Sequence, residues 1–408
     1  MAGLVQSVTI VVQQVPASLT ATGTFSQPIV TLPVGASFGL SCKVEDRNGY
    51  PMSIPLTVSS RSGTVSVSAC DSARVSRSGF DALTVTGGGL SAQVPIVVAA
   101  APVVSTSIGD WLPMDSLPSG TGPWAPTLRR NSKGLLELYI AAYPAANDSF
   151  GESRGNLYRY VSPNGVSFNY DGIVLQHDSL PCQVNGSGIE NIAIVPRSDS
   201  AGWRMYYSSG SFDCYGWQVF SAVSTDERTW VRESGPRIPN GGTYPPQGPV
   251  PPPWPSGEGM VVDQLPSGQW RMIVSTYEHV LPSQNKFQIT EWQSNDQVNW
   301  TYVDPVLTTR QMPASAERSV YSPTISEVVP GLYRMIFTGD NLDQPGGRSA
   351  LWSAVSLDKV TWQLEGQLIG GPNSNILYSS LVGNMLVFLR QDLNGTPRGV
   401  AFSTVSMP

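Results

Sequence analysis

Four times in this chain a serine is followed six residues later by a large aromatic residue, and an acidic residue usually lies between them. The four pairs are Ser162 and Phe168, Ser224 and Trp230, Ser294 and Trp300, and Ser356 and Trp362. The serines stand 62, 70 and 62 residues apart. An internal repeat of this length, built from short alternating strands, predicts a β-propeller in which each repeat forms one blade.

A second signature precedes the last three serines. It reads Gly202-Trp203-Arg204-Met205, Gly268-Gln269-Trp270-Arg271-Met272 and Gly331-Leu332-Tyr333-Arg334-Met335. The alternation of apolar and polar residues in it is typical of a strand with two different faces. We expect four antiparallel strands in each repeat, with this signature as the second strand and the segment opened by the aromatic residue as the outermost one.

The residues between each serine and its aromatic partner predict a tight turn, because Asp, Asn and Gly either bond the backbone of the turn or relax its sterics. The aromatic ring is then placed to pack between blades. We therefore interpret the repeated tryptophans as packing residues of the ring and not as ligand-binding residues.

The end of the chain indicates how the ring closes. Three further strands follow the fourth repeat, at residues 375–382, 385–389 and 399–405. Ser406 then falls where the other repeats carry their turn serine, and the missing outermost strand has a candidate in residues 107–116, around Trp111. We expect a five-bladed β-propeller over residues 105–408, closed by pairing of the 107–116 strand with the C-terminal blade, because closure removes both sheet edges.

Residues 1–100 form a separate module rich in Val, Ser, Thr and Gly. Strand-like runs lie at residues 8–13, 37–44, 56–60, 82–86 and 93–98. Many short strands in a module of this size predict a β-sandwich. The stretch from Val34 to Gly49, followed by residues 56–60 and 94–98, resembles bacterial immunoglobulin-like repeats, so the chain is expected to be all-β, with an N-terminal immunoglobulin-like β-sandwich.

Charge and hydropathy exclude several classes of partner. The chain carries 24 basic and 30 acidic residues, a net charge of −6, and has no basic cluster interleaved with aromatic residues. We therefore expect no nucleic-acid partner. No apolar stretch approaches the length needed to span a bilayer, so no membrane insertion is expected either.

The four cysteines divide between the two modules, with Cys42 and Cys70 in the first and Cys182 and Cys214 in the ring. The absence of a C-x-x-C spacing and the presence of only two histidines argue against zinc and for one disulfide per domain. Disulfides favour an extracellular setting, whereas the N-terminus lacks the features of a signal peptide. We expect a protein outside the cell or on the surface of a virus particle released by lysis.

The ring resembles the five-bladed propeller superfamily of glycosidases that includes arabinanases, β-xylosidases, invertases and levansucrases, and its turns are similar to the Asp-box of sialidases. The resemblance implies three acids at the starts of innermost strands: a base on the first blade, a second acid that tunes pKa, and a general acid followed by glycine. Glu258-Gly259 matches the general acid and Glu190 matches the second acid. The first blade, at residues 123–128, offers no carboxylate at the corresponding place.

Other candidates for a sugar site lie on the predicted rim, mostly after the second strand of a blade. They are Asp213, Tyr244, Trp254, His279, Glu317, Arg318 and Asp340. Aromatic faces bind the apolar side of a sugar ring, and carboxylates accept hydrogen bonds from its hydroxyl groups. We predict no cofactor and no metal site, since calcium near Asp340 and Asp343 rests only on loop acids, which are abundant.

Three functions from different classes therefore compete. We expect a carbohydrate-recognising attachment protein, with a glycan or polysaccharide as partner and other copies or subunits of a surface assembly around it, because the first blade lacks the base. A secreted glycoside hydrolase of the arabinanase or β-xylosidase type is the alternative, favoured by Glu190 and Glu258. A structural decoration protein without a small ligand is the second alternative. Propellers host enzymes, binders and scaffolds, so the fold does not decide whether the protein is an enzyme.

Overall fold

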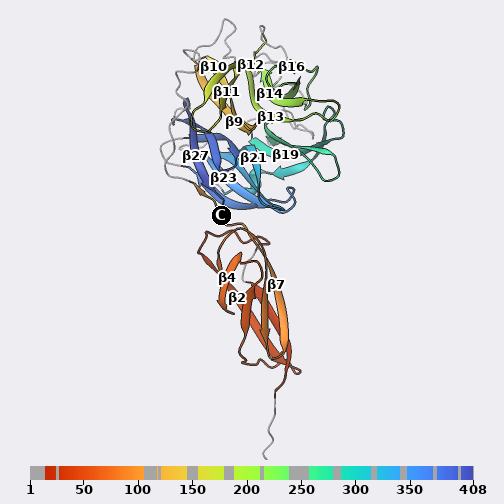
Figure 1. Cartoon of the computed structure of the whole chain (residues 1–408), viewed down its shortest axis with the longest axis vertical. Coiled ribbons are helices and arrows are strands. Elements are labelled where there is room, and N and C mark those ends of the chain that lie inside the picture. The colour runs from red at the N-terminus through yellow and green to blue at the C-terminus, as the bar shows by residue number, and fades with distance from the viewer. Residues whose placement is uncertain are drawn as a thin grey trace, which may run out of the picture. The chain divides into compact units, whose positions relative to one another are not determined.

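The computed structural model of this chain is all-β, as predicted, and Figure 1 shows its strands as arrows. It describes residues 14–23, 27–104, 117, 121–144, 155–178, 188–211, 216–238, 257–278, 286–313, 319–340, 347–370, 375–393 and 397–407. Within these ranges one 3-10 turn, η2 (Thr309–Gln311), accompanies the strands. The chain divides into two compact units, Met1–Pro102 with Met407–Pro408, and Val103–Ser406.

The first unit contains two antiparallel sheets, with strand orders β1-β2-β5-β4 and β3-β6-β7. The strands are β1 (Pro16–Gly23), β2 (Ser37–Asp46), β3 (Thr57–Ser60), β4 (Val65–Ala69), β5 (Ser72–Val75), β6 (Gly79–Gly87) and β7 (Leu90–Val98). Alternate residues of β6 and β7, such as Leu83 and Ile96, are buried in the core of the unit. The sequence patterns predicted β2, β3, β6 and β7 but not β1, β4 or β5, and the predicted strand 8–13 lies outside the described residues.

A disulfide and a buried carboxylate hold the loops of the first unit in place. Cys42 on β2 forms the predicted disulfide with Cys70, whereas Cys182 and Cys214 lie outside the described residues. The buried carboxylate of Asp81 accepts hydrogen bonds from the backbone N–H groups of residues 61, 62, 64 and 65 and from the Ser60 hydroxyl. One side chain therefore satisfies the backbone donors of a whole loop, which is how a buried charge is tolerated.

The second unit contains five four-stranded antiparallel sheets, which we number I to V in chain order. Sheet I has the order β12-β11-β10-β9 and is built from β9 (Thr121–Arg130), β10 (Leu136–Pro144), β11 (Asn156–Ser162) and β12 (Asn169–Leu175). Sheet II runs β13 (Gly188–Pro196), β14 (Trp203–Ser211), β15 (Gly216–Ser224), β16 (Val231–Arg232). Sheet III runs β17 (Glu258–Gln264), β18 (Trp270–Glu278), β19 (Lys286–Ser294), β20 (Thr301–Leu307). Sheet IV runs β21 (Ser319–Val329), β22 (Leu332–Asp340), β23 (Ser349–Ser356), β24 (Gln363–Ile369).

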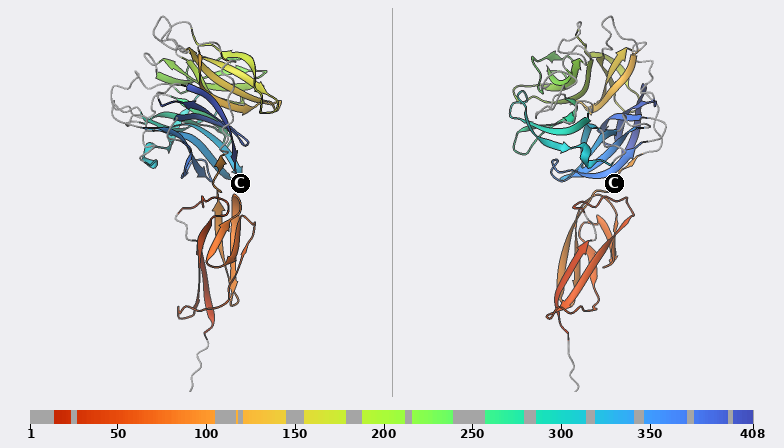
Figure 2. Two further views of the ribbon diagram at one scale, coloured as in Figure 1. Left: turned by 90° about the vertical axis from the view of Figure 1, so that its left-hand side faces the viewer. Right: turned by 180° about the vertical axis from the view of Figure 1, so that it is seen from behind.

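Sheet V draws its strands from both ends of the unit. It has the order β25 (Asn375–Val382), β26 (Met385–Gln391), β27 (Pro397–Ser406) and β8 (Val103–Val104), with Val405 opposite Val104. The predicted closing strand, residues 107–116, lies outside the described residues, and the strand that pairs with β27 precedes it in the chain. In Figure 2 the sheets of this unit follow one another around a ring in chain order, from yellow through green to blue.

The repeated serines and acids form the predicted turns. In sheet II, Asp226 accepts hydrogen bonds from the Ser224 hydroxyl and from the backbone N–H groups of Arg228 and Thr229. Asn164, Asp296 and Asp358 make the corresponding bonds in sheets I, III and IV. Each turn is thus closed by its own side chains, in the manner expected of Asx turns.

The repeated aromatic residues pack on the preceding sheet, which confirms their interpretation as packing residues. The Phe168 ring of sheet I stacks on Phe402 of sheet V, with 5.3 Å between ring centroids. The Trp300 ring of sheet III meets Tyr206 of sheet II edge-on at 5.6 Å. Trp230 and Trp362 are buried in the clusters that join sheets I and II and sheets III and IV.

A residue three positions after each turn serine also contacts the preceding sheet. We call Gly165, Glu227, Gln297 and Lys359 the latch residues. Glu227, Gln297 and Lys359 have positive φ values of 60°, 66° and 61°, and Gly165 has 74°. The left-handed backbone carries each side chain towards its neighbour: Glu227 pairs with Arg129, Gln297 accepts from Arg204, and Lys359 pairs with Asp263. Glu227, Gln297 and Lys359 therefore join sheets I to IV in succession through polar contacts, whereas Gly165 has no side chain to form one.

The arginines of the repeated signature lie in the core of their sheets. Arg204, Arg271 and Arg334 are at most 1% exposed. They pair with Glu233, Asp263 and Glu365, with N to O distances of 2.7 to 2.8 Å. In sheet I the charges are reversed, because Glu137 occupies the equivalent position and accepts from Arg159 at 2.6 Å. A buried charge is stable only beside a partner of opposite charge, so each arginine of the signature occurs together with an acidic residue elsewhere in its repeat.

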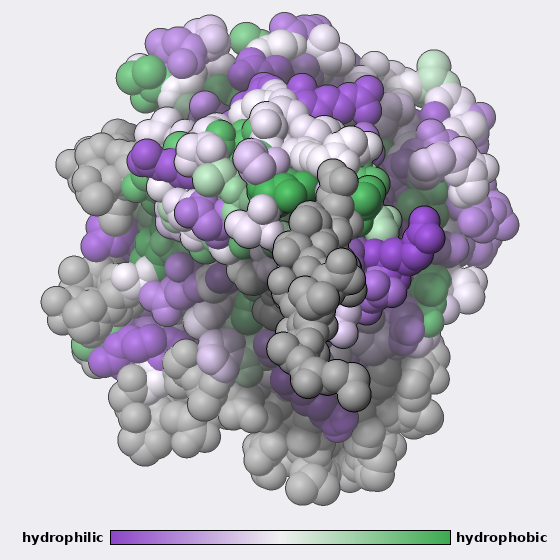
Figure 3. Space-filling view, turned by 90° about the horizontal axis from the view of Figure 1, so that it is seen from below, coloured by the Kyte–Doolittle hydropathy of each residue, from purple (hydrophilic) through white to green (hydrophobic). Residues whose placement is uncertain are grey.

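The surface carries no dominant apolar face in the view of Figure 3. Hydrophilic and neutral side chains cover most of the described surface in that view, and apolar ones form small separate patches. Scattered apolar residues of this kind are normal on a protein surface. Within the described ranges, no helix has the length and apolar character that a membrane crossing requires.

Candidate functional site

The five innermost strands of the ring each contain a β-bulge at the same place. The bulge residues are Ala125, Asn191, Gly259, Ser322 and Tyr378, with φ values between 42° and 60°. Together with the latch residues they account for every non-glycine residue of positive φ in the described part of the chain. Such conformations are costly outside glycine and cluster at functional sites.

The bulges lie close to one another around the axis of the ring. A Cβ atom added to Gly259 of sheet III would lie 2.6 Å from the Cα of Ser322 of sheet IV, so the bulge of β17 admits only glycine at this position. A bulge rotates the residue before it relative to the regular pleat of the strand. In sheets II and III the residues before the bulge are Glu190 and Glu258, which brings two carboxyl groups to equivalent positions on adjacent sheets.

Both carboxyl groups are buried. Glu190 is 1% exposed and Glu258 is 6% exposed, and no arginine or lysine pairs with either of them among the described residues. The Tyr378 hydroxyl of sheet V donates a hydrogen bond of 2.6 Å to Oε1 of Glu258. Glu258 is therefore held in the interior by a neutral partner, the Tyr378 hydroxyl, and not by a counter-ion.

Burial and repulsion between carboxyl groups favour the neutral forms of both side chains. Burial raises the pKa of Glu258 to about 7, the negative charge of Asp340 adds to the rise, and the Tyr378 hydrogen bond opposes it. Burial raises the pKa of Glu190 well above its usual range, and the charge of Glu258 raises it further. Two carboxyl groups that interact in this way titrate as a pair and can share one proton across neutral pH.

Tyr143 of β10 lies beside Glu190. Two glycines make room for its ring, because a Cβ atom on Gly155 or Gly188 would lie 2.7 Å or less from atoms of Tyr143. The negative charges of Glu190 and Glu258 add to burial in raising the pKa of Tyr143 well above its usual range. The Tyr143 hydroxyl and Glu190 Oε2 lie without a hydrogen bond of normal geometry to any described group. The two side chains nevertheless lie close enough for each to shift the pKa of the other: Glu190 raises that of Tyr143, and Tyr143 lowers that of Glu190.

A third carboxyl group and a group of aromatic rings complete the site. Asp340 on β22 is buried and accepts a hydrogen bond from the Tyr321 hydroxyl. The Tyr378 ring contacts Tyr321 at 5.6 Å and Trp124 at 5.4 Å between centroids. Aromatic surface beside carboxyl groups is the combination that binds the apolar and polar sides of a sugar.

A small cavity of about 50 Å³ lies on the other side of the bulges, along the axis. Its lining includes Asn191, Ser322 and Ser379, from sheets II, IV and V. Asn191 Nδ2, Ser322 Oγ and Ser379 Oγ are buried and have no hydrogen-bond partner among the described groups. The axis is therefore polar on both sides of the ring of bulges.

Sheet I differs from sheets II and III at the bulge. Trp124 precedes the bulge residue Ala125, so no carboxylate stands at the place that corresponds to Glu190 and Glu258. No group of three or more His, Cys, Asp and Glu side chains in the described ranges has an arrangement that holds a metal ion.

The predicted rim residues have different outcomes. Asp213, Tyr244, Trp254, His279, Glu317 and Arg318 lie outside the described residues. Asp340 is described and lies beside Tyr321 and Glu258. Sequence reasoning missed Trp124, Tyr143, Tyr321 and Tyr378. A comparison of the five innermost strands would have found Trp124, Tyr321 and Tyr378, because they stand at or directly before the bulge residue.

No protein-family model matches the sequence, and a comparison with curated protein sequences found no match. Solved structures do match. A thermostable family-43 glycoside hydrolase is 15% identical with a TM-score of 0.51, and the match covers 74% of this chain and 92% of the other. BT0996 in a complex with RGII is 13% identical with a TM-score of 0.53, over 71% of this chain and 88% of that one. A fructofuranosidase from Schwanniomyces occidentalis complexed with fructosylnystose is 15% identical with a TM-score of 0.50, over 71% of this chain and 57% of its own. At these identities the similarity concerns the fold, so the second unit has the propeller fold found in glycoside hydrolases.

Proposed function

We propose that this protein is a glycoside hydrolase whose reaction takes place at the Glu190 and Glu258 pair. The observation that carries the proposal is that two buried carboxyl groups on adjacent innermost strands both have raised pKa values, with the pKa of Glu258 at about 7. Glycoside hydrolysis needs one carboxylic acid that donates a proton and one carboxylate that accepts one, and a pair that shares a proton supplies both at neutral pH.

Glu258 is the proton donor in this proposal. Its pKa of about 7 leaves a substantial fraction of it protonated near neutral pH, and the Tyr378 hydroxyl fixes its orientation. The proton passes to the oxygen of the leaving group as the glycosidic bond breaks. Glu190 is the acceptor, which activates water or attacks the sugar, because Asp340 is bonded to Tyr321 and sheet I offers Trp124 instead of a carboxylate. Burial and the charge of Glu258 hold the pKa of Glu190 well above its usual range, so this role uses the form of the pair in which the shared proton resides on Glu258 and Glu190 is ionised.

The propeller fold found among glycoside hydrolases supports this alternative better than it supports an attachment role, although it does so at the level of the fold. The proposal includes five blades, one for each of sheets I to V, with the ring closed by β8 and β27. It also includes an immunoglobulin-like character for the first unit, whose two sheets pack around one core.

Release of sugar from a panel of glycans tests the function. The wild type is incubated with arabinan, xylan, fructan and mannan, and new reducing ends are measured. Glu258→Gln and Glu190→Gln keep the shape of each side chain and remove its acid function, so each should lower the rate at least a hundredfold. Asp304→Asn is the matched control, because Asp304 is an exposed acid of β20. Equal rates in Glu258→Gln and wild type would exclude this site.

Glycan recognition without hydrolysis is the second candidate. It is favoured by Trp124 and Ala125 at the bulge of sheet I, where a carboxylate is missing, and by the 1% exposure of Glu190. Binding on a glycan array together with no release of reducing ends would favour this candidate. Silence in both assays would favour a structural role in a surface assembly.

The Cys42–Cys70 disulfide supports a location outside the cell or on a virus particle, since such bonds persist in oxidising compartments. Alkylation of free thiols before lysis, followed by mass spectrometry, tests this part of the proposal. Alkylated Cys42 in material collected from the native source would contradict it.

A further inference from the structure

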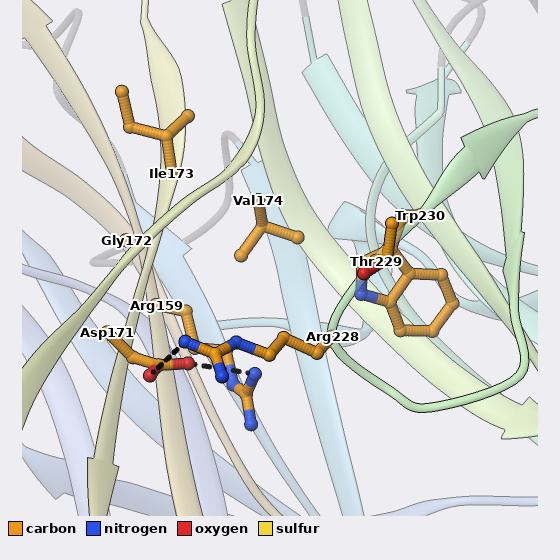
Figure 4. A pocket seen from close by; sticks show the side chains of 8 residues that line it. All are labelled: Arg159, Asp171, Gly172, Ile173, Val174, Arg228, Thr229 and Trp230. Atoms are coloured by element: carbon orange, nitrogen blue, oxygen red, sulfur yellow. Dashed lines mark hydrogen bonds and ion pairs between the residues drawn. The ribbon is translucent and has the colours of Figure 1, made fainter.

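A second pocket lies between the outer parts of sheets I and II, away from the carboxyl pair. It has a volume of about 300 Å³. Its lining residues are Arg159, Asp171, Gly172, Ile173, Val174, Arg228, Thr229 and Trp230, which come from β11, β12 and the turn before β16. We call it the seam pocket. Figure 4 shows these side chains around a common space, with Ile173 and Val174 above Asp171 and the two arginines.

The ring of Trp230 packs between sheets I and II as its counterparts pack in the other repeats, but its indole N–H group differs from theirs. The indole N–H groups of Trp300 and Trp362 donate to the carbonyl oxygens of Gln297 and Lys359 in their own turns, at 3.3 and 3.2 Å. The Trp230 side chain is 8% exposed, and its indole nitrogen has no hydrogen-bond partner among the described groups. Figure 4 shows that nitrogen on the edge of the ring turned towards the other lining residues. A buried donor without a partner lacks a hydrogen bond that a ligand acceptor could provide.

Arg228 crosses the seam between the two sheets. It reaches from the turn of sheet II to Asp171 on β12, with a distance of 3.1 Å between Nη2 and Oδ1. Its side chain is 65% exposed, so its other N–H groups face solvent at the mouth of the pocket. The equivalent positions in sheets III and IV hold Val298 and Val360, so the arginine is particular to this seam.

The charges of the pocket are balanced within the protein. Arg159 pairs with Asp171 at 3.0 Å and with the buried Glu137 at 2.6 Å, and Arg228 pairs with Asp171. Two positive and two negative groups therefore cancel, and a ligand needs no net charge. The space offers N–H donors from Trp230 and Arg228, carboxylate oxygens from Asp171, and an apolar wall from Ile173 and Val174.

We propose that the seam pocket binds a neutral hexose or pentose residue of a glycan. A sugar ring presents hydroxyl groups that both donate and accept, and C–H faces that contact apolar side chains, so it matches each part of this lining. The pocket would hold a glycan chain at a point remote from the carboxyl pair. It requires neither hydrolysis nor any residue of that pair.

The Trp230 indole resonance in a ¹H–¹⁵N spectrum reports directly on the pocket. The signal is assigned by its loss in Trp230→Phe, which keeps the ring packing and removes the N–H. Glucose, galactose, mannose, xylose and arabinose are then titrated to about 100 mM, because a single sugar residue binds with a dissociation constant on the order of 1 mM or weaker. At least one of them should shift this signal in a saturable manner.

Arg228→Val tests the lining and gives sheet II the residue found in sheets III and IV. It should weaken binding about tenfold, as expected for the loss of a hydrogen bond to a charged group. Arg310→Ala, at an exposed arginine of η2, is the matched control and should bind as the wild type does. Glu258→Gln should also bind normally, which separates this result from the outcome for the proposed hydrolase. A Trp230 signal unaffected by all five sugars, or shifted equally in Arg228→Val, would overturn the proposal.

Discussion

The Tyr378 hydroxyl donates a 2.6 Å hydrogen bond to Glu258, although the two residues lie on different sheets and 120 positions apart in the chain. Tyr378 stands at the bulge of β25 and Glu258 directly before the bulge of β17. The contact depends on the ring, because the strands that carry it belong to sheets III and V. It also makes the acidity of Glu258 sensitive to a residue of another sheet.

Removal of that hydroxyl should shift the pH dependence of activity. The Tyr378 hydrogen bond lowers the pKa of Glu258 against the effect of burial. In Tyr378→Phe the pKa should therefore rise above about 7. Since the donor must be protonated, the alkaline limb of the kcat/KM profile should move to higher pH. Tyr170→Phe, at an exposed tyrosine of β12, is the control, and an alkaline limb that stays in place or moves to lower pH would contradict the assignment.

The Glu258 carboxyl should also make stability depend on pH. Its pKa is about 7 in the folded protein against an ordinary value of 4.5, so the folded state retains a proton that the unfolded state releases between these values. Stability should therefore fall as pH rises through this window, by about 1.4 kcal/mol for each pH unit, and level off above it. In Glu258→Gln the share of Glu258 should be lost, which leaves a shallower decline from Glu190, whose pKa is also raised by burial. Urea unfolding at several pH values measures the effect, and parallel curves for the two proteins would contradict it.

Substitutions at the latch residue Gln297 distinguish the cost of backbone strain from the contribution of side-chain hydrogen bonds. Its side chain accepts from Ser198 N–H and Arg204 and donates to the Pro196 carbonyl, all on sheet II or the turn that follows β13. Gln297→Ala should cost about 2–4 kcal/mol, because it removes these bonds and leaves buried groups unpaired. Gln297→Gly should cost about 1 kcal/mol less than the alanine variant, because glycine adopts the φ of 66° without strain. A glycine variant less stable than the alanine variant would contradict this account, and Gln367→Ala, at an exposed glutamine of β24, serves as the control.

The Cys42–Cys70 disulfide should stabilise the first unit alone. It links residues separated by 28 positions. A loop of this length gives about 3.6 kcal/mol on chain-entropy grounds. Calorimetry of Cys42→Ala/Cys70→Ala should show one transition moved to lower temperature, with the transition of the ring unchanged. A shift of both transitions would show that the units unfold together.

Asp81 should make the stability of the first unit depend on pH in the acid range. Hydrogen bonds from Ser60 and the backbone lower its pKa in spite of burial, which acts to raise it. Its contribution to stability is therefore present above the unfolded pKa of 3.8 and is lost as pH falls through the lower folded value. Asp81→Asn should destabilise the unit by about 2–3 kcal/mol at pH 7, since one acceptor becomes a donor facing backbone N–H groups. The stability of the first unit is measured by unfolding at several acid pH values. The same loss of stability with falling pH in Asp81→Asn as in the wild type would contradict this role.

The repeat in the sequence was sufficient to predict the order of the strands within each sheet and the packing role of the repeated aromatic residues. Serine and aspartate at a fixed spacing close a turn by hydrogen bonds within the turn, and the turn places the tryptophan that follows. All of these residues are close in sequence, so their arrangement could be predicted from the sequence. Glu190 and Glu258 were found because the resemblance to propeller glycosidases implies acids at the starts of the innermost strands. Their convergence could not be derived, because it depends on bulges that shift the register by one residue.

The contacts between different sheets could not be predicted from the sequence. The pairing of Glu227 with Arg129, and of Lys359 with Asp263, joins residues of different repeats whose charges compensate only after the ring has formed. Tyr143 was missed for a related reason. It enters the site because Gly155 and Gly188 leave space for it, and neither glycine belongs to a motif. The closing strand was expected at 107–116, whereas the strand that pairs with β27 is β8, a segment of two residues with no pattern of its own.

The pairing of β8 with β27 has a consequence for biosynthesis. β8 leaves the ribosome before any other strand of the ring, and β27 leaves it after all the others. Sheet V therefore stays incomplete while the rest of the unit is being translated, and β26 presents unpaired backbone groups to its surroundings. A chaperone that shields this edge would act during a defined interval, which ends when the final strand emerges.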